Sequence, residues 1–296
     1  MNKYFKFLIV VVGILLLSVI LMPFLYWLLS PFFRFEKIFD RLIMVLAVLA
    51  AFIFVMRRSR MNVVMSRETW REYGFDFSVD WRRLFTVGAM TGVLMVLILS
   101  LLEVAVGPRY WRQPLMISDI IERFFKGILS GMTVGIVEEF FFRGFIFGYL
   151  RRKMRLIWAV ALASVFYSLT HFLDNGQIFI PAYPTIKDAA RLLFGYLEPV
   201  TRRPLVILPE FFGLFLFGVA LSIAYIRTKS LFFSIGLHAG TIFLIKFQYS
   251  FIRPGSEFFD PWFGNKPFYD GPIEWIFLFL LGFAVWWLTN RPAKVD

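Results

Sequence analysis

The chain has 296 residues, of which 59% are hydrophobic, 20% are aromatic and only 18% are charged. This composition, with a mean hydropathy of +0.71, excludes an ordinary water-soluble domain and is typical of a polytopic membrane protein. The net charge of +12 comes from short basic clusters between apolar runs, a pattern that sets membrane topology, so we expect contact with the lipid bilayer and no nucleic-acid partner.

About 20 residues are needed for one crossing, so the apolar runs predict about eight transmembrane helices. Lys3 and Lys6 precede the first run without a small-x-small cleavage site, and we interpret this run as a retained helix. The sequence therefore predicts an all-α polytopic membrane helical bundle, formed by a single membrane domain over 1–296. The expected helices cover about 7–29, 40–56, 84–106, 118–150, 156–173, 206–226, 230–246 and 273–290.

Basic residues predict the orientation of these helices. One cluster follows the second helix and another directly follows the fourth, and positive loops stay in the cytoplasm. With an even number of crossings, we expect a multi-pass protein of the cytoplasmic membrane with both termini in the cytoplasm. The longer loops 174–205 and 247–272, on the opposite side, are expected to lie at the membrane interface. The clusters contain Arg57, Arg58, Arg60, Arg67, Arg71, Arg82 and Arg83, then Arg151, Arg152, Lys153 and Arg155, with Arg227 and Lys229 also inside.

Few ionisable side chains fall inside the predicted helices, where each charge costs about 2.5 to 3.5 kcal/mol. A rise of about 1.5 Å per residue places Glu138, His171 and His238 at comparable depth, measured from the basic clusters. The same measure places Glu103 and Glu210 near the far interface, where we expect them to be solvated or among lipid headgroups. The sequence has no cysteine, so any nucleophile must be oxygen-based and any metal ligand must be His, Asp or Glu.

The fourth helix carries a GxxxGxxxG stripe of Gly127, Gly131 and Gly135, which allows close approach of another helix. In an unbroken helix, Glu138 falls within the angular range of the stripe, while Glu139 and Arg143 fall to one side as an i, i+4 ion pair. Both histidines lie on polar stripes, with Ser164, Tyr167 and Ser168 near His171 and Ser234 and Thr241 near His238.

Packing alone offers another explanation, in which the charges form a buried ion-pair cluster and the histidines are hydrogen-bonded core residues. Packing does not require comparable depth and inward facing of all these groups together, so we favour a functional site.

The motif EExxxR at 138–143, with intramembrane His171 on the next helix and His238 two helices later, resembles the CPBP family of membrane proteases, also called the CAAX protease and bacteriocin-processing or Abi family. The resemblance covers about 118–245, the expected catalytic core, and leaves two N-terminal accessory helices at about 7–56. Two positions depart from the family pattern. Tyr167 stands at the aromatic position of FxxxH, and Ile242 stands where HxxxN or HxxxD has its last residue, with Thr241 displaced by about 100° around the helix.

The resemblance implies an intramembrane endopeptidase that acts on a membrane-associated peptide or protein. In the family pattern, Glu138 activates a water with help from His171, His238 stabilises the oxyanion, and Glu139 paired with Arg143 orients the site. Thr241 is the candidate replacement for the missing donor. This version needs no cofactor, and an alternative makes Glu138, His171 and His238 the ligands of a zinc ion.

Two other functions remain open at this point. One is a catalytically inactive scaffold or immunity factor of the same fold, which the Ile242 departure supports. The other is a proton-coupled transporter, against which the two halves show no matching pair of helices interrupted by glycine or proline.

Overall fold

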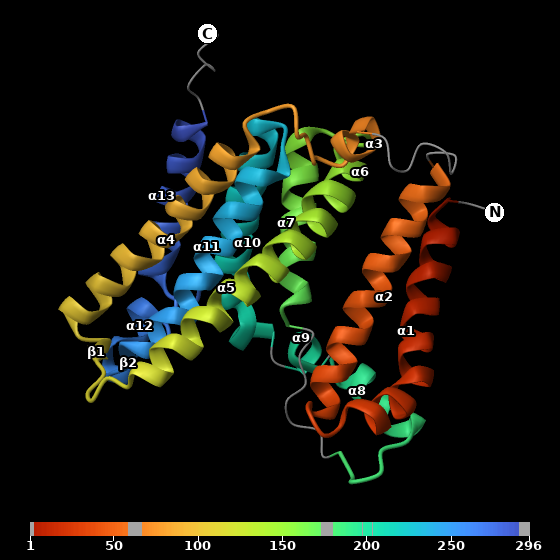
Figure 1. Cartoon of the computed structure of the whole chain (residues 1–296), viewed down its shortest axis with the longest axis horizontal. Coiled ribbons are helices and arrows are strands. Elements are labelled where there is room, and N and C mark those ends of the chain that lie inside the picture. The colour runs from red at the N-terminus through yellow and green to blue at the C-terminus, as the bar shows by residue number, and fades with distance from the viewer. Residues whose placement is uncertain (1–2, 59–66, 173–179, 197, 203, 290–296) are drawn as a thin grey trace. The chain divides into compact units, whose positions relative to one another are not determined.

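A computed structural model describes residues 3–58, 67–172, 180–196, 198–202 and 204–289 (Figure 1). The chain divides into two compact units, which we describe separately. The first unit comprises Met1–Val64 and Thr170–Ile207, and the second comprises Met65–Leu169 and Leu208–Asp296. Arg60 of the first basic cluster and residue 173, the predicted end of the fifth helix, lie outside the described residues.

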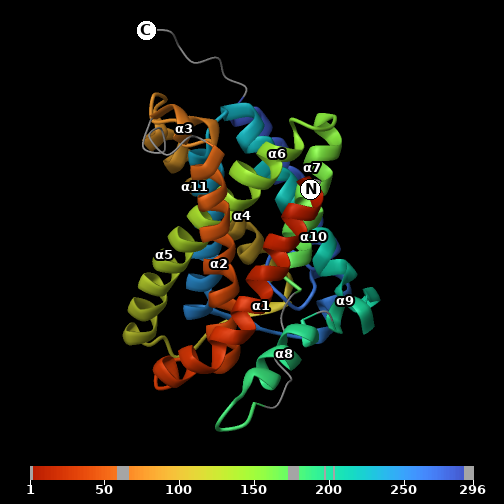
Figure 2. The same cartoon turned by 90° about the vertical axis from the view of Figure 1, so that its right-hand side faces the viewer.

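The first unit is built on two long helices, α1 (Lys3–Leu29) and α2 (Phe35–Arg58), which lie side by side in both views (Figures 1 and 2). Two short helices, α8 (Ile186–Gly195) and α9 (Glu198–Arg202), complete it. Met22, Phe39 and Leu192 are fully buried in the core between α1, α2 and α8. The Tyr196 hydroxyl also donates a hydrogen bond to Asp40 of α2. The two predicted N-terminal helices are therefore present.

The second unit contains the remaining helices and one small sheet. Its strands, β1 (Arg109–Trp111) and β2 (Ile252–Pro254), pair antiparallel with Tyr110 opposite Arg253. Two 3₁₀ turns, η2 (Gln248–Ser250) and η3 (Glu257–Phe259), lie on either side of β2. The helices are α3 (Arg67–Glu72), α4 (Trp81–Val106), α5 (Ile117–Glu139), the π-helix η1 (Phe140–Phe147), α6 (Gly148–Leu150), α7 (Leu156–Thr170), α10 (Pro204–Thr228), which begins in the first unit, α11 (Leu231–Phe247), α12 (Asp260–Phe263) and α13 (Pro272–Leu288).

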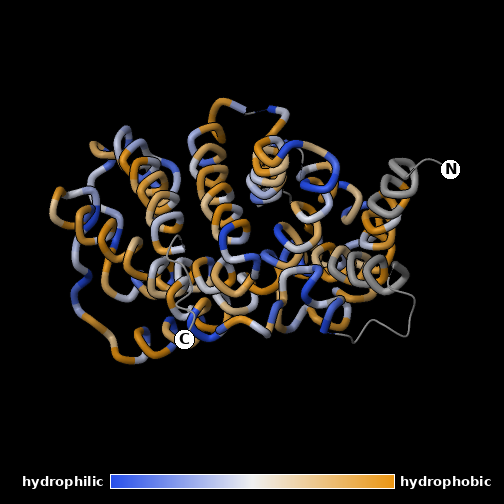
Figure 3. The backbone as a smooth tube through the Cα atoms, turned by 90° about the horizontal axis from the view of Figure 1, so that it is seen from above, coloured by the Kyte–Doolittle hydropathy of each residue, from blue (hydrophilic) through white to orange (hydrophobic). Residues whose placement is uncertain are grey.

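Each of the eight predicted membrane helices has a counterpart in the structure, which confirms the all-α membrane bundle. In the described part of the chain, four helical segments are long and apolar enough to cross a bilayer, and α7 and α13 are shorter apolar helices. Figure 3 shows that most helical segments are coloured as hydrophobic, whereas hydrophilic residues gather in the connections. The four long segments are Val12–Leu29, Trp81–Val106, Pro204–Thr228 and Leu231–Ser250.

Helix α11 packs between α4 and α5 at backbone-to-backbone distance. A side chain at Gly131 of α5 would place its Cβ 2.5 Å from the Ala239 carbonyl oxygen, and one at Gly92 of α4 would come within 2.4 Å of the Leu237 oxygen. Glycine removes the Cβ atoms that would otherwise keep these helices apart. The predicted role of the glycine stripe as a close helix contact is therefore confirmed.

The fourth predicted helix is not one continuous α-helix, because it changes to the π-helix η1 after Glu139. The buried stripe continues from Gly135 to Glu139, which is completely buried, whereas the Glu138 side chain is 23% exposed. Complete burial on this face therefore falls on Glu139, which the sequence placed to one side of the stripe, and not on Glu138. The physical reason is that α11 follows the inclined i, i+4 ridge of α5, so the contact moves around the helix.

The basic segments of the second unit gather at one end of it. Arg152 lies 3.6 Å from Glu72 of α3, the Arg151 guanidinium lies 5.5 Å from the Tyr225 ring, and the Leu231 amide donates to the Gly74 carbonyl. This is the arrangement that a common cytoplasmic side requires, and the side itself stays a prediction.

The acidic residues predicted near the far interface are both paired. Glu103 is 1% exposed and accepts a hydrogen bond of 2.8 Å from the Arg109 Nε, so the expectation that it is solvated is wrong. Burial is possible because Arg109, at the start of β1, supplies the compensating charge. Glu210 lies 2.5 Å from the Lys266 ammonium.

Candidate active site

The centre of the candidate site is the buried carboxylate of Glu139, the last residue of α5. Its Oε1 atom accepts a hydrogen bond of 2.8 Å from the Arg143 guanidinium and lies 2.9 Å from the Nδ1 atom of His238. All three side chains are almost completely buried, with exposed fractions of 0%, 1% and 2% respectively. The predicted pairing of Glu139 with Arg143 is confirmed, and the structure adds His238 to it.

Arg143 reaches this carboxylate from the first turn of η1. Its Nη2 donates a hydrogen bond of 3.2 Å to the Gly218 carbonyl of α10, and its guanidinium lies 4.5 Å from the centre of the Tyr167 ring. The carboxylate, the carbonyl and the aromatic face together compensate a charge that would otherwise be buried unpaired. Arg143 therefore connects α10 and α7 to Glu139.

The imidazole of His238 is oriented by its contact with Glu139. The Glu139 Oε1 atom accepts a hydrogen bond from the Arg143 guanidinium, and an accepting carboxylate oxygen assigns a hydrogen to the Nδ1 atom of His238. The Nε2 atom then faces the opposite way, where the Tyr167 hydroxyl oxygen lies 3.5 Å away and the Glu138 Oε2 lies 3.9 Å away. The ring also packs edge-on against Phe217 of α10.

Glu138 differs from its neighbour in both exposure and partners. Its side chain is 23% exposed, although its Oε2 atom is buried and accepts no hydrogen bond from the residues that the structure describes. A carboxylate that is open on one side and faces a histidine on the other can be reached by water.

Thr241 is buried one turn after His238, but its hydroxyl faces another helix. A Cβ atom at Gly92 of α4 would lie 2.7 Å from the Thr241 Oγ1, which places this hydroxyl against α4. The hydroxyl makes no hydrogen bond within the described ranges. Its predicted part in the site stays a prediction.

His171 lies in the turn after α7, not inside a helix as predicted. Helix α7 ends at Thr170, and the His171 side chain is exposed. His171 belongs to the first unit, whereas Glu138, Glu139, Arg143, Tyr167 and His238 all belong to the second. The contacts described above all lie within the second unit, and the predicted part of His171 stays a prediction.

The zinc alternative requires three ligands close together. Across the portions of the chain that are described, no three His, Asp or Glu side chains gather in a way that could hold a metal ion. The predicted zinc ligands, Glu138, His171 and His238, stay a prediction, and we derive no step through zinc.

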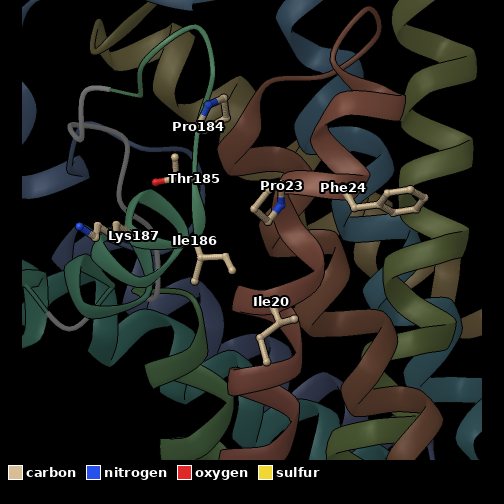
Figure 4. Close-up of a pocket in the computed structure, with 7 residues that line it drawn as sticks. All are labelled: Ile20, Pro23, Phe24, Pro184, Thr185, Ile186 and Lys187. Carbon is tan, nitrogen blue, oxygen red and sulfur yellow. The ribbon is translucent and has the colours of Figure 1, made fainter.

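A surface groove of about 690 Å³ lies within the first unit, apart from these residues (Figure 4). It is lined by Ile20, Pro23 and Phe24 of α1 and by residues 184–187 at the start of α8. Figure 4 shows Ile186 pointing across the groove towards Ile20, and Lys187 pointing away from α1. None of the candidate catalytic side chains lines it.

Two features of the site were missed by reasoning from the sequence. The π-helix that begins after Glu139 leaves no recognisable signal in a run of aromatic residues. The contact between the Tyr167 hydroxyl and His238 was also missed, because the sequence places Tyr167 on the polar stripe of His171 and gives no sign of which other helix that stripe faces. Tyr167 and His238 each lie on a polar stripe of a membrane helix, and this shared feature could have indicated that the two side chains meet.

A comparison with protein families identifies the segment that contains this cluster. Residues 121–244 match the family described as Rce1-like, the type II CAAX prenyl endopeptidases. No curated protein and no solved structure matches the chain. The matched segment includes the EExxxR motif, Tyr167, His171 and His238. Residues 121–244 are thus similar to the Rce1-like CAAX endopeptidases, a family of membrane proteases, in agreement with the resemblance that the motifs indicated.

Proposed function

We propose that this membrane protein is an intramembrane endopeptidase that hydrolyses a peptide bond of a membrane-associated protein or peptide. The observation that carries the proposal is the contrast between two adjacent carboxylates. Glu139 is fully buried and held by Arg143 and His238, whereas Glu138 is partly open and has one oxygen that accepts no hydrogen bond from the described residues. The first can orient a site, and the second can act on a substrate.

Glu138 is the general base in this proposal. Its Oε2 lies 3.9 Å from the Nε2 of His238, which is too long for a hydrogen bond and allows both atoms to contact one water molecule. Glu138 removes a proton from this water as the water oxygen attacks the carbonyl carbon. The carbonyl oxygen becomes an oxyanion, and when the C–N bond breaks the proton passes from Glu138 to the amine.

Glu139 and Arg143 act through His238. Their hydrogen bonds fix which imidazole nitrogen faces Glu138, as second partners do for histidines in many enzymes. In the family pattern, His238 stabilises the oxyanion and His171 helps Glu138 to activate the water. For His238 this requires a hydrogen on Nε2, and thus an imidazolium, because Nδ1 already donates to Glu139.

The substrate that the family name suggests is a peptide ending in a prenylated CAAX sequence. The helices that could span a bilayer place the chain where such a lipidated peptide is concentrated. A farnesylated peptide of this type, compared with the same peptide without its lipid, separates a prenyl-dependent enzyme from a general membrane endopeptidase.

The test uses the full chain in liposomes and measures release of the C-terminal tripeptide by mass spectrometry. Glu138→Gln keeps the size and most hydrogen bonds of the side chain but removes its basicity, so the rate should fall by at least about 10²-fold while the protein stays folded. Glu122→Gln is the matched control on the same helix, because Glu122 is exposed and forms an exposed ion pair with Lys126. An unmodified chain that cleaves neither peptide, or a fully active Glu138→Gln, would refute the proposal and favour an inactive scaffold.

A further inference from the structure

The proposed function assigns roles to Glu138, Glu139, Arg143 and His238, but it assigns none to the Tyr167 hydroxyl. Tyr167 is 1% exposed on α7, and its ring is fixed by an edge-on contact with Phe142 and by the Arg143 guanidinium. Its hydroxyl oxygen lies 3.5 Å from the Nε2 of His238. A phenylalanine would make the same ring contacts, so packing does not explain the hydroxyl.

The direction of this hydrogen bond follows from Glu139. Because Glu139 accepts from the Nδ1–H of His238, a neutral imidazole has a lone pair on Nε2 and cannot donate there. The Tyr167 hydroxyl must then donate to Nε2. Its hydrogen therefore lies on the side of His238 that also faces Glu138 at 3.9 Å. On this side a neutral His238 presents only the Nε2 lone pair, so it cannot donate a hydrogen bond to an oxyanion, whereas Tyr167 can.

The other hydroxyl considered for this task faces elsewhere. Thr241 lies against Gly92 of α4, and Ile242, at the next position, has no hydrogen-bonding group. Tyr167 is the hydroxyl that the described structure brings to His238.

We propose that the Tyr167 hydroxyl donates the hydrogen bond that stabilises the oxyanion, and that His238 Nε2 holds this hydroxyl in place before the oxyanion forms. The assignment rests on the proposed function. In the addition step, the electron pair of the carbonyl bond moves to oxygen while Glu138 takes the proton of the water. Tyr167 turns its hydrogen from Nε2 to that oxygen, and no proton leaves it.

Tyr167→Phe tests this assignment, since it removes one oxygen atom and keeps the ring. We expect kcat to fall by about 10² to 10³-fold, with KM within about twofold and an unchanged unfolding temperature. Adding Ile242→Asn to this variant supplies an amide one turn after His238 on the same helix face, and recovery of rate in the double variant would support a donor role. A purely structural hydroxyl would not be replaced in this way.

Tyr225→Phe is the matched control. Tyr225 is a buried tyrosine of the same unit that packs on Phe147 and Arg151, away from His238, so its loss should leave kcat unchanged. A kcat for Tyr167→Phe within about twofold of the unmodified chain, or a loss confined to KM, would overturn the assignment. If Tyr167→Phe is active and Glu138→Gln is inactive, the role of Tyr167 is refuted but the proposed function is not. If Glu138→Gln is active, both proposals are refuted.

Discussion

Replacing Glu139 by glutamine removes one charge from the centre of the site and almost no volume. Glutamine still presents an oxygen to the Arg143 guanidinium and to His238, so the hydrogen bonds can form again. The Arg143 charge, however, stays in place at 1% exposure, and its remaining partners among the described residues are the Gly218 carbonyl and the rings of Tyr167 and Phe142. The variant therefore measures the cost of a buried charge without its counter-charge.

The expected cost is large because neither partner can reach solvent. Removing one member of a buried ion pair typically destabilises a protein by about 3 to 5 kcal/mol, whereas an exposed pair contributes about 0 to 1 kcal/mol. Glu122 and Lys126 of α5 form such an exposed pair, with side chains 56% and 69% exposed. We thus expect Glu139→Gln to shift the unfolding equilibrium by roughly two to four orders of magnitude, and Glu122→Gln by less than tenfold.

Reversible unfolding of the purified chain in mixed detergent, followed by tryptophan fluorescence, measures this difference. Adding Arg143→Met to Glu139→Gln removes the unpaired charge and should restore most of the lost stability. If Glu139→Gln loses less than about 1 kcal/mol, or if the double variant is less stable than the single one, the charge at Arg143 is compensated by something other than Glu139.

Three other predictions concern the rest of the second unit. Gly131→Ala should lower the unfolding temperature by several degrees, because its Cβ would meet the Ala239 carbonyl oxygen at 2.5 Å, whereas Gly282→Ala should have little effect, because nothing lies within 4 Å. Hydrogen bonds from Ser78 and the charge of Arg71 lower the pKa of Asp76 below its ordinary 3.8. The ionised carboxylate therefore stabilises the fold at neutral pH. This contribution is lost as the pH falls through the pKa of Asp76 in the folded chain. Asp76→Asn should therefore be less stable than the unmodified chain at pH 7, with the difference shrinking in acid, and a constant difference would contradict this. In this cysteine-free chain, cysteines at Lys153 and Asn265 should be labelled from opposite sides of the membrane, and labelling from one side would refute the predicted topology.

The sequence predicted the bundle because apolar runs of membrane length are determined by composition alone, and all eight have helical counterparts. The Glu139–Arg143 pair was also predictable, since an i, i+4 spacing depends only on local helix geometry. The burial of Glu139 rather than Glu138 was not, because it depends on how α11 crosses α5. The pairing of Glu103 with Arg109 was missed for a similar reason, since it requires the chain to turn back after α4.

The glycine contacts of α11 have a consequence for how the site keeps its shape. A helix held against its neighbours by side chains can roll as those side chains change rotamer, but α11 touches backbone on two sides and has little freedom to roll. The position of the His238 backbone relative to Glu139 is thus fixed by the packing of α11, and the contact with Glu139 then orients the ring. Gly88 and Gly240 contact no catalytic group, but a larger residue at either position should displace α11 and with it His238. Such substitutions should consequently lower the catalytic rate as a substitution that moves His238 would.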